Sequence, residues 1–138
     1  TGMSQLISLV VAVNGEYLAT YGADGIILST PTGSTGYNMS AGGPIVDPKA
    51  DLILITPINS HDITSKSIVV GADANITVEL STRRPEKDET ADVSFDGDRI
   101  VHMKVGDKIL VRKAAKSTEI LKLNRVSFLQ ILRRKMRP

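Results

Sequence analysis

The residues best suited to chemistry lie in one short segment, from Ser29 to Gly36, which holds five hydroxyl side chains and two glycines. The segment follows a short apolar run and precedes a stretch that favours a helical turn. A loop that leaves a strand, turns on glycines and enters a helix can direct free backbone N–H groups at one point, and hydroxyl groups add donors and acceptors. The segment therefore predicts a loop that handles the phosphate or ribose of a nucleotide.

This loop differs from a P-loop in one decisive residue type. The sequence contains no G-x-x-x-x-G-K-[ST] pattern, and no lysine follows Gly33. Without a fixed cation, a triphosphate held as in a P-loop is excluded. The loop suits ribose hydroxyls, an amide, or a diphosphate whose charge is shared with groups elsewhere. The alternative, from the residues alone, is an ordinary Ser/Thr-rich turn whose hydroxyls bond to their own backbone.

The elements that must position this loop are mainly strands. The runs Leu6–Val13 and Glu16–Tyr21 flank Asn14-Gly15, the strongest short signal for a β-hairpin. Further short runs, separated by Gly, Asp, Asn or Pro, favour an all-β domain with a β-sandwich or barrel-like sheet. They are Ile26–Ser29, Leu52–Thr56, Ser67–Val70, Ile76–Leu80, Val93–Phe95, Arg99–Val105, Lys108–Arg112 and Glu119–Leu123.

The remaining segments predict two helices and several turns. A helical turn is expected at Ser34–Ala41, stopped by two glycines and a proline. A second helix begins near Ser127, which forms an S-x-x-Q capping box with Gln130 and precedes one apolar stripe. Asp96-Gly97 and Gly106-Asp107 fit turns. The polar run at 83–89 predicts an exposed hairpin loop.

Composition bounds the class of protein. With 138 residues, 41% hydrophobic and 23% charged, residues 1–138 are expected to form a single domain with a real core. The lack of cysteine excludes disulfides and thiolate metal sites and fits a reducing cytoplasm. No run approaches the roughly eighteen apolar residues of a membrane span. No signal peptide is recognised, and we expect Thr1-Gly2-Met3 to be an expression scar before an internal start.

The net charge of +2 comes from the last six residues of the chain. Arg133, Arg134, Lys135 and Arg137 contribute +4, which leaves −2 for the rest of the chain. Basic residues at the end of a helix mostly complement its dipole. Two Phe, three Tyr and no Trp, with no aromatic spacing inside a basic stripe, argue against a nucleic-acid-binding surface.

The segment Asp24–Pro44 resembles the hallmark segment of the NAD kinase family, which usually reads DG-apolar-STPTGSTAY-SAGGP. The resemblance continues through LILITPI, VSFDGDR and KLNRVSFLQILRRKM and covers nearly the whole chain. It implies a β-sandwich-like, NAD-binding C-terminal domain with a short helical turn after the TPTGST loop and a C-terminal helix. The family's N-terminal α/β domain, with its Gly-Gly-Asp-Gly motif and Asn-Glu pair, is absent from this sequence.

The resemblance also implies roles for single residues. It places Asp24 at the nicotinamide end of NAD, Thr32 and Thr35 along the dinucleotide pocket, Tyr37 beside the ligand, and Asp96 near the pocket. A carboxylate can accept hydrogen bonds from a carboxamide or ribose, and a tyrosine ring offers a flat face with a polar tip. The full predicted binding set is Asp24, Thr32, Ser34, Thr35, Gly36, Tyr37, Asn59 and Asp96. No catalytic residue and no metal ligand is predicted in this chain.

Two places depart from the family pattern. Gly36 replaces the commoner alanine, which should loosen the turn slightly while leaving its backbone contacts possible. Asn59-Ser60-His61 stands where relatives have a cysteine or small residue followed by Pro-His, and His61 is interpreted as structural. Asp96 and Asp98 could suggest a Mg²⁺ site, but carboxylates two residues apart on a tight turn more often point to different places.

The implied reaction is attack of the adenosine 2′-hydroxyl of NAD on the terminal phosphate of ATP or polyphosphate, with Mg²⁺, to give NADP. The family's general base is the aspartate of the missing Gly-Gly-Asp-Gly motif, so we expect this chain to be inactive alone. The expected partners are NAD or NADP, the N-terminal domain, to which the C-terminal helix would return, and further copies in a dimer or tetramer.

Three alternatives remain beside this interpretation. A diacylglycerol or sphingosine kinase shares the two-domain plan, but the unbroken TPTGST motif favours NAD. A noncatalytic β-sandwich module, for carbohydrate for example, usually offers exposed aromatics, whereas the aromatic content here is 4%. A structural or oligomerisation domain is compatible with the same strands.

Overall fold

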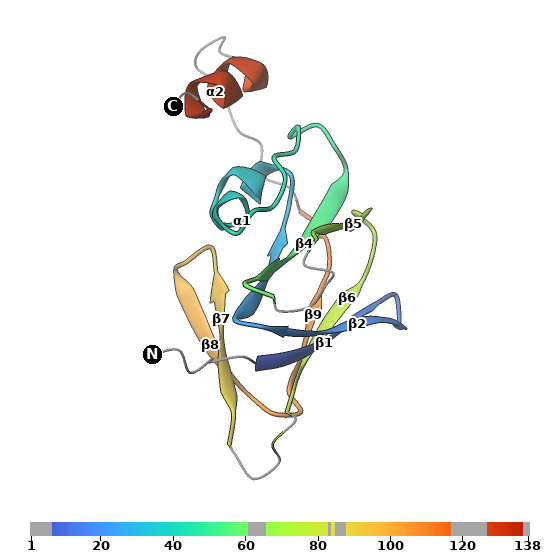
Figure 1. Ribbon diagram of the computed structural model, residues 1–138. Helices are drawn as coiled ribbons and strands as arrows, with labels where there is room; N and C mark the ends of the chain where they lie inside the picture. Colours follow the sequence, from blue (N-terminus) through green and yellow to red (C-terminus); the bar gives the residue numbers. More distant parts are fainter. Residues whose placement is uncertain (1–6, 61–65, 83, 85–87, 117–126, 137–138) are drawn as a thin grey trace.

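The computed structural model describes residues 7–60, 66–82, 84, 88–116 and 127–136. Within these residues, antiparallel strands form two sheets and a separate hairpin; short helices lie between β3 and β4 and at the C-terminal end (Figure 1). The predicted β-sandwich-like, all-β fold is therefore confirmed. The predicted strand at 119–123 and part of the predicted loop at 83–89 lie outside the described residues.

The larger sheet has the strand order β2-β1-β6-β9. Its first hairpin turns at Asn14 and Gly15, whose φ angles of 52° and 80° are both positive, as a type I′ turn requires. The Asn14 side chain also accepts a hydrogen bond from the backbone N–H of Asn75 at 2.8 Å, which ties the turn to the start of β6. The four strands are β1 Ile7–Val13, β2 Glu16–Ala23, β6 Ile76–Ser81 and β9 Lys108–Val111.

The smaller sheet has the order β3-β4-β5, and its central strand is buried on both faces. The side chains of Ile53 and Ile55 join the sandwich core, whereas Leu54 and Thr56 are buried on the opposite face. This double burial explains why the run is nearly continuous in apolar residues rather than alternating. The three strands are β3 Gly25–Ser29, β4 Leu52–Ile58 and β5 Ile68–Gly71.

The core lies between these sheets. Its side chains come from alternate positions, so that β6 follows a strict buried and half-buried pattern, as its sequence predicts. The buried members are Leu9, Val11, Tyr21, Ala23, Ile53, Ile55, Ile76, Val78, Leu80 and Met103.

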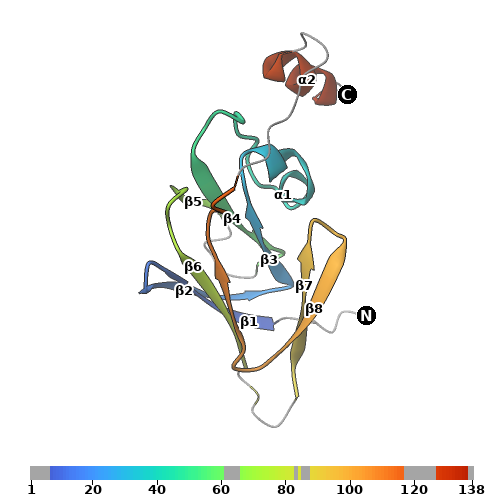
Figure 2. The same ribbon diagram turned by 180° about the vertical axis from the view of Figure 1, so that it is seen from behind.

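The strands β7, Thr90–Phe95, and β8, Arg99–Lys104, form a separate antiparallel hairpin. Its turn has positive φ at Asp96 and Gly97, 53° and 75°, and Gly106 after β8 has φ of 95°, so both predicted turns are confirmed. Figures 1 and 2 show the turn between β7 and β8 directed toward the end of the molecule that carries α1.

The predicted helix at 34–41 is replaced by two shorter pieces. A 3₁₀ turn, η1, spans Thr32–Thr35, and a short helix, α1, spans Tyr37–Ser40. Gly36 separates them because its backbone, at φ −91° and ψ −132°, is not helical.

The C-terminal helix α2 spans Phe128–Lys135. Its capping box forms as predicted: the Ser127 side chain accepts from the Gln130 backbone at 3.2 Å, and Gln130 Oε1 accepts from the Ser127 backbone at 2.9 Å. No residue of α2 is buried, and the apolar side chains of Leu129 and Met136 are exposed. The helices among the described residues are too short to cross a membrane.

We expect the sandwich core to supply most of the stability. Leu80 is 0% exposed and Leu110 is 56% exposed, so the same truncation can be compared in the core and on the surface. Leu80→Ala should lower the free energy of unfolding by about 2–5 kcal/mol. Leu110→Ala should change it by no more than about 0.5 kcal/mol. Urea titration followed by circular dichroism measures both, and equal losses would contradict this location of the core.

Candidate functional site

The strand β3 places candidate residues at both of its ends. Asp24 precedes this five-residue strand, and the loop that begins at Thr30 follows it. A strand rises about 3.3 Å per residue, so its first and last residues, Gly25 and Ser29, are four steps or about 13 Å apart. A ligand that contacts both Asp24 and the loop must therefore be elongated.

At the first end, Asp24 is paired with a second residue of the predicted set. The side-chain amide of Asn59 donates to Asp24 Oδ2 at 2.9 Å, and the Asp24 backbone N–H donates to the Ile58 carbonyl at 2.9 Å. Asn59 has a positive φ of 49°, which turns the chain at the end of β4. Both side chains are exposed. Because a carboxylate has about four acceptor positions, this pair orients Asp24 and leaves capacity for a ligand.

At the other end, the loop uses much of its backbone internally. The N–H of Ser34 donates to the Pro31 carbonyl and that of Gly36 to the Gly33 carbonyl, both at 3.1 Å. The N–H of Gly33 donates to Thr30 Oγ1 at 3.2 Å. These three donors are therefore engaged, so the loop is poorer in free N–H groups for a phosphate than its sequence suggests.

The loop instead presents side-chain hydroxyls. Thr32 is exposed and Thr35 half-buried, and within the described residues neither hydroxyl forms a hydrogen bond. Gly36 is exposed between them and α1. Tyr37 begins α1, and its side chain lies outside the described part of the structure, as does His61. The loop thus offers two hydroxyls to a ligand that carries polar groups such as ribose hydroxyls.

Ser34 differs from its neighbours because its side chain is fully buried. Its Oγ donates to the Pro31 carbonyl at 2.7 Å and accepts from the Val46 backbone N–H at 2.9 Å. Its hydroxyl therefore holds the loop together, and any contribution to a site comes through the shape of the loop.

Asn38, which sequence reasoning missed, is the centre of a buried polar network. Its side chain is 1% exposed; Nδ2 donates to the Ser34 carbonyl at 3.3 Å and to the Pro44 carbonyl at 2.9 Å, and Oδ1 accepts from Thr56 Oγ1 at 2.5 Å. The Thr56 and Ser67 hydroxyls are 2.7 Å apart. A single threonine inside the apolar run LILITPI was the signal that could have revealed a buried hydroxyl needing a partner.

The Asn38 amide leaves no space at Gly43. A Cβ atom built on Gly43 would lie 2.3 Å from Asn38 Oδ1 and 2.5 Å from its Cγ, far inside van der Waals contact. The Gly43 N–H donates to the Asn38 backbone carbonyl at 2.7 Å. The glycine is therefore required by close approach.

Asp96 lies on the turn between β7 and β8. Its side chain is exposed, and within the described residues it forms no hydrogen bond or ion pair. The described part of the chain also contains no group of three His, Cys, Asp or Glu side chains suited to a metal ion.

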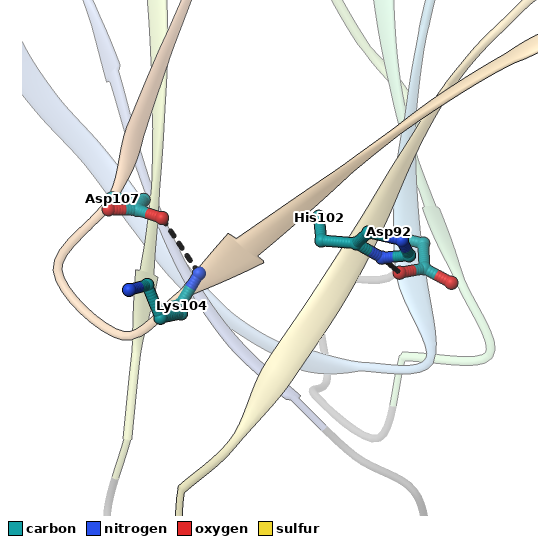
Figure 3. Close-up of polar contacts among 4 residues, drawn as sticks. All are labelled: Asp92, His102, Lys104 and Asp107. Atoms are coloured by element: carbon teal, nitrogen blue, oxygen red, sulfur yellow. Dashed lines mark hydrogen bonds and ion pairs between the residues drawn. The ribbon is translucent and has the colours of Figure 1, made fainter.

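A second polar region lies on β7, β8 and the turn that follows β8 (Figure 3). His102 Nδ1 and Asp92 Oδ1 are 2.7 Å apart, and the Lys104 backbone N–H donates to Asp107 Oδ2 at 2.8 Å. Both His102 and Asp92 are exposed, so their ion pair contributes little stability. The region borders a cavity of about 290 Å³ that is lined by Val93, Phe95, Val101, His102, Met103, Asp107, Lys108 and Ile109, none of them in the predicted binding set.

Comparison with known proteins identifies the family to which this chain belongs. The model of the ATP-NAD kinase C-terminal domain matches residues 2–123. The chain belongs to the NAD kinase family. Among its curated relatives, the NAD kinase of Agathobacter rectalis is 58% identical over 135 residues, and that of Lachnoclostridium phytofermentans is 42% identical over 135 residues. These matches favour the NAD kinase interpretation over the lipid kinase and carbohydrate-binding alternatives.

Solved structures of the NAD kinase family share the fold. A yeast NADH kinase complexed with NADH matches 86% of this chain with a TM-score of 0.77 and 32% identity, over 34% of its own length. An NAD kinase from Archaeoglobus fulgidus in complex with ATP matches 80% of this chain with a TM-score of 0.69 and 31% identity, over 40% of its length.

The chain spans about half of its curated relatives. The alignments cover 98% of this chain but 48% and 47% of the two NAD kinases. The family membership therefore identifies the domain, whereas the activity belongs to proteins about twice as long.

The contact between Gly43 and Asn38 gives a direct test of the loop. Gly43→Ala should lower the free energy of unfolding by about 1–3 kcal/mol, because the added methyl has no space. Gly22→Ala is the matched control, since a Cβ there would meet nothing within 4 Å, and it should change stability by no more than about 0.5 kcal/mol. Urea unfolding of both variants measures the difference, and an unchanged Gly43→Ala protein would refute the close approach.

Proposed function

We propose that this chain forms the dinucleotide-binding part of an NAD kinase. The observation that carries the proposal is the placement of Asp24 and of the Thr32 and Thr35 hydroxyls at opposite ends of β3, in a domain of this family. A dinucleotide is long enough to contact both ends. The relative complexed with NADH supports the same class of ligand.

The polar groups suit the sugar and amide parts of a dinucleotide better than its phosphates. Asp24, oriented by Asn59, would accept from the carboxamide or a ribose hydroxyl. Thr32 and Thr35 would hydrogen-bond to ribose, with Gly36 giving close backbone access and Ser34 holding the loop. Tyr37 and Asp96 complete the proposed set, as the resemblance implies.

In the proposed reaction, the adenosine 2′-hydroxyl oxygen of NAD forms a bond to the terminal phosphorus of ATP or polyphosphate. The bond from that phosphorus to the leaving phosphate chain breaks, and the hydroxyl proton passes to a general base, giving NADP and the shortened donor. The donor enters as its Mg²⁺ complex. The resemblance places the base in the Gly-Gly-Asp-Gly motif of the N-terminal domain, so this chain would orient the acceptor hydroxyl. Homo-oligomeric assembly and a cytoplasmic location are parts of the same proposal.

The proposal separates dinucleotide binding from catalysis. The purified chain should form no NADP above a buffer control when given NAD, ATP and Mg²⁺. The native gene product, with whatever upstream sequence its gene encodes, should form NADP under the same conditions. Chromatographic detection of NADP measures both, and NADP formation by the chain alone would show that the base lies within these 138 residues.

The role of Asp24 can be tested by removing only its charge. Asp24→Asn should weaken NAD binding about tenfold, the scale of one hydrogen bond to a charged group. Asp107→Asn is the control, because Asp107 lies on the turn between β8 and β9 and asparagine can still accept from Lys104. The Michaelis constant for NAD in the native gene product provides the measurement. Equal effects of the two substitutions would remove Asp24 from the proposed site.

A further inference from the structure

We propose that Asn38 is a positioning residue that fixes the loop from Thr30 to Gly36 by joining it to β4. The inference rests on the proposed function, because it names what holds that site in shape. Asn38 is 1% exposed, so it cannot itself contact a ligand at the surface. Its effect on a ligand must pass through the groups to which it bonds.

The partners of Asn38 fix which way its amide points. The backbone carbonyls of Ser34 and Pro44 are acceptors only, so the group that faces them must be the NH₂. The carbonyl oxygen Oδ1 then faces Thr56, whose hydroxyl must donate to it. The opposite orientation would set oxygen against two carbonyl oxygens and is excluded.

This orientation sets the direction of the whole network. The Thr56 hydroxyl has one hydrogen, which it donates to Asn38. The Ser67 hydroxyl, 2.7 Å away, must therefore donate to the Thr56 oxygen. The hydrogen bonds therefore run in one direction, from the residue before β5, through β4 and Asn38, to the loop carbonyls. A one-way network of this kind has no alternative arrangement in which each buried group is still satisfied.

The network ends at Ser34, the residue between the two threonines whose hydroxyls are proposed to bind the ligand. Ser34 lies between Thr32 and Thr35 in the same 3₁₀ turn, and its carbonyl accepts from Asn38 while its hydroxyl accepts from Val46. Because Ser34 is held from both sides, the positions of its neighbours Thr32, which is exposed, and Thr35, which is half-buried, are held as well. Loss of the Asn38 amide should therefore misplace the groups proposed to bind NAD.

The experiment compares variants that keep shape but change hydrogen bonding. Asn38→Asp is isosteric and keeps the acceptor for Thr56, but its carboxylate cannot donate to the two carbonyls. Thr56→Val keeps volume and removes the hydroxyl, while Thr56→Ser keeps the hydroxyl. Ile55→Val, on the same strand but facing the core, controls for general destabilisation. Asn75→Ala, an exposed asparagine at the start of β6, controls for the residue type.

The first measurement is the steady-state kinetics of the native gene product. Asn38→Asp and Thr56→Val should raise the Michaelis constant for NAD about tenfold, the scale of one or two lost hydrogen bonds, with kcat within about twofold. Thr56→Ser, Ile55→Val and Asn75→Ala should stay within about twofold of the wild type. An unchanged constant in Asn38→Asp, or an equal rise in Ile55→Val, would overturn the proposal.

The second measurement tests positioning without any ligand. Amide hydrogen exchange of Ser34, Gly36 and Val46 should accelerate at least tenfold in Asn38→Asp and in Thr56→Val, while exchange of Val11 in β1 stays unchanged. If the wild-type product neither binds nor phosphorylates NAD, the proposed function fails, and exchange still decides the role of Asn38. Unchanged exchange at the three loop amides would overturn that role even in an active enzyme.

Discussion

The burial of β4 on both faces is the constraint on which the rest of the structure depends. One face, with Ile53 and Ile55, fills the sandwich core, and the other carries Thr56 into a second buried layer. A hydroxyl in such a layer must be hydrogen-bonded, because an unpaired buried polar group costs about 1–3 kcal/mol. Asn38 supplies the partner, and the space its amide occupies in turn requires glycine at position 43. The burial of Thr56 therefore accounts for two residues that follow the loop, Asn38 and Gly43.

The parts of the fold that could be predicted from the sequence are those whose cause lies within a few residues. Asn14-Gly15 demands a turn with positive φ, and the capping box at Ser127 and Gln130 is complete within four positions, so both appear as expected. Strand alternation likewise indicates which face of β6 is buried. The division of the predicted helix at Gly36 was not foreseen, because the residue pattern does not show that the Gly36 backbone leaves the helical conformation. The bond between Asn38 and Thr56 joins residues 18 positions apart, which no local pattern reveals.

The candidate site shows the same limit. The sequence marks a run of hydroxyl residues and treats its members alike, since each can donate and accept. The structure distinguishes them. Thr32 is exposed and Thr35 is half-buried, whereas the buried Ser34 hydroxyl is hydrogen-bonded to Pro31 and Val46. The pairing of Asp24 with Asn59 also arises only when the start of β3 pairs with the end of β4. Residue type therefore predicts which residues are candidates for the site. Tertiary packing determines which of their side chains are available to a ligand and which hold the loop together.

The internal hydrogen bonding of the loop also indicates which part of the proposed reaction the loop can serve. A loop whose N–H groups at Gly33, Ser34 and Gly36 are engaged, and which has no lysine, is poorly suited to neutralise phosphate charge. The exposed carboxylates of Asp24 and Asp96 would oppose such charge further. Phosphoryl transfer depends on charge neutralisation, so a site of this composition suits selection and orientation of the acceptor. In the proposed reaction, the cations and the general base would then come from outside this loop.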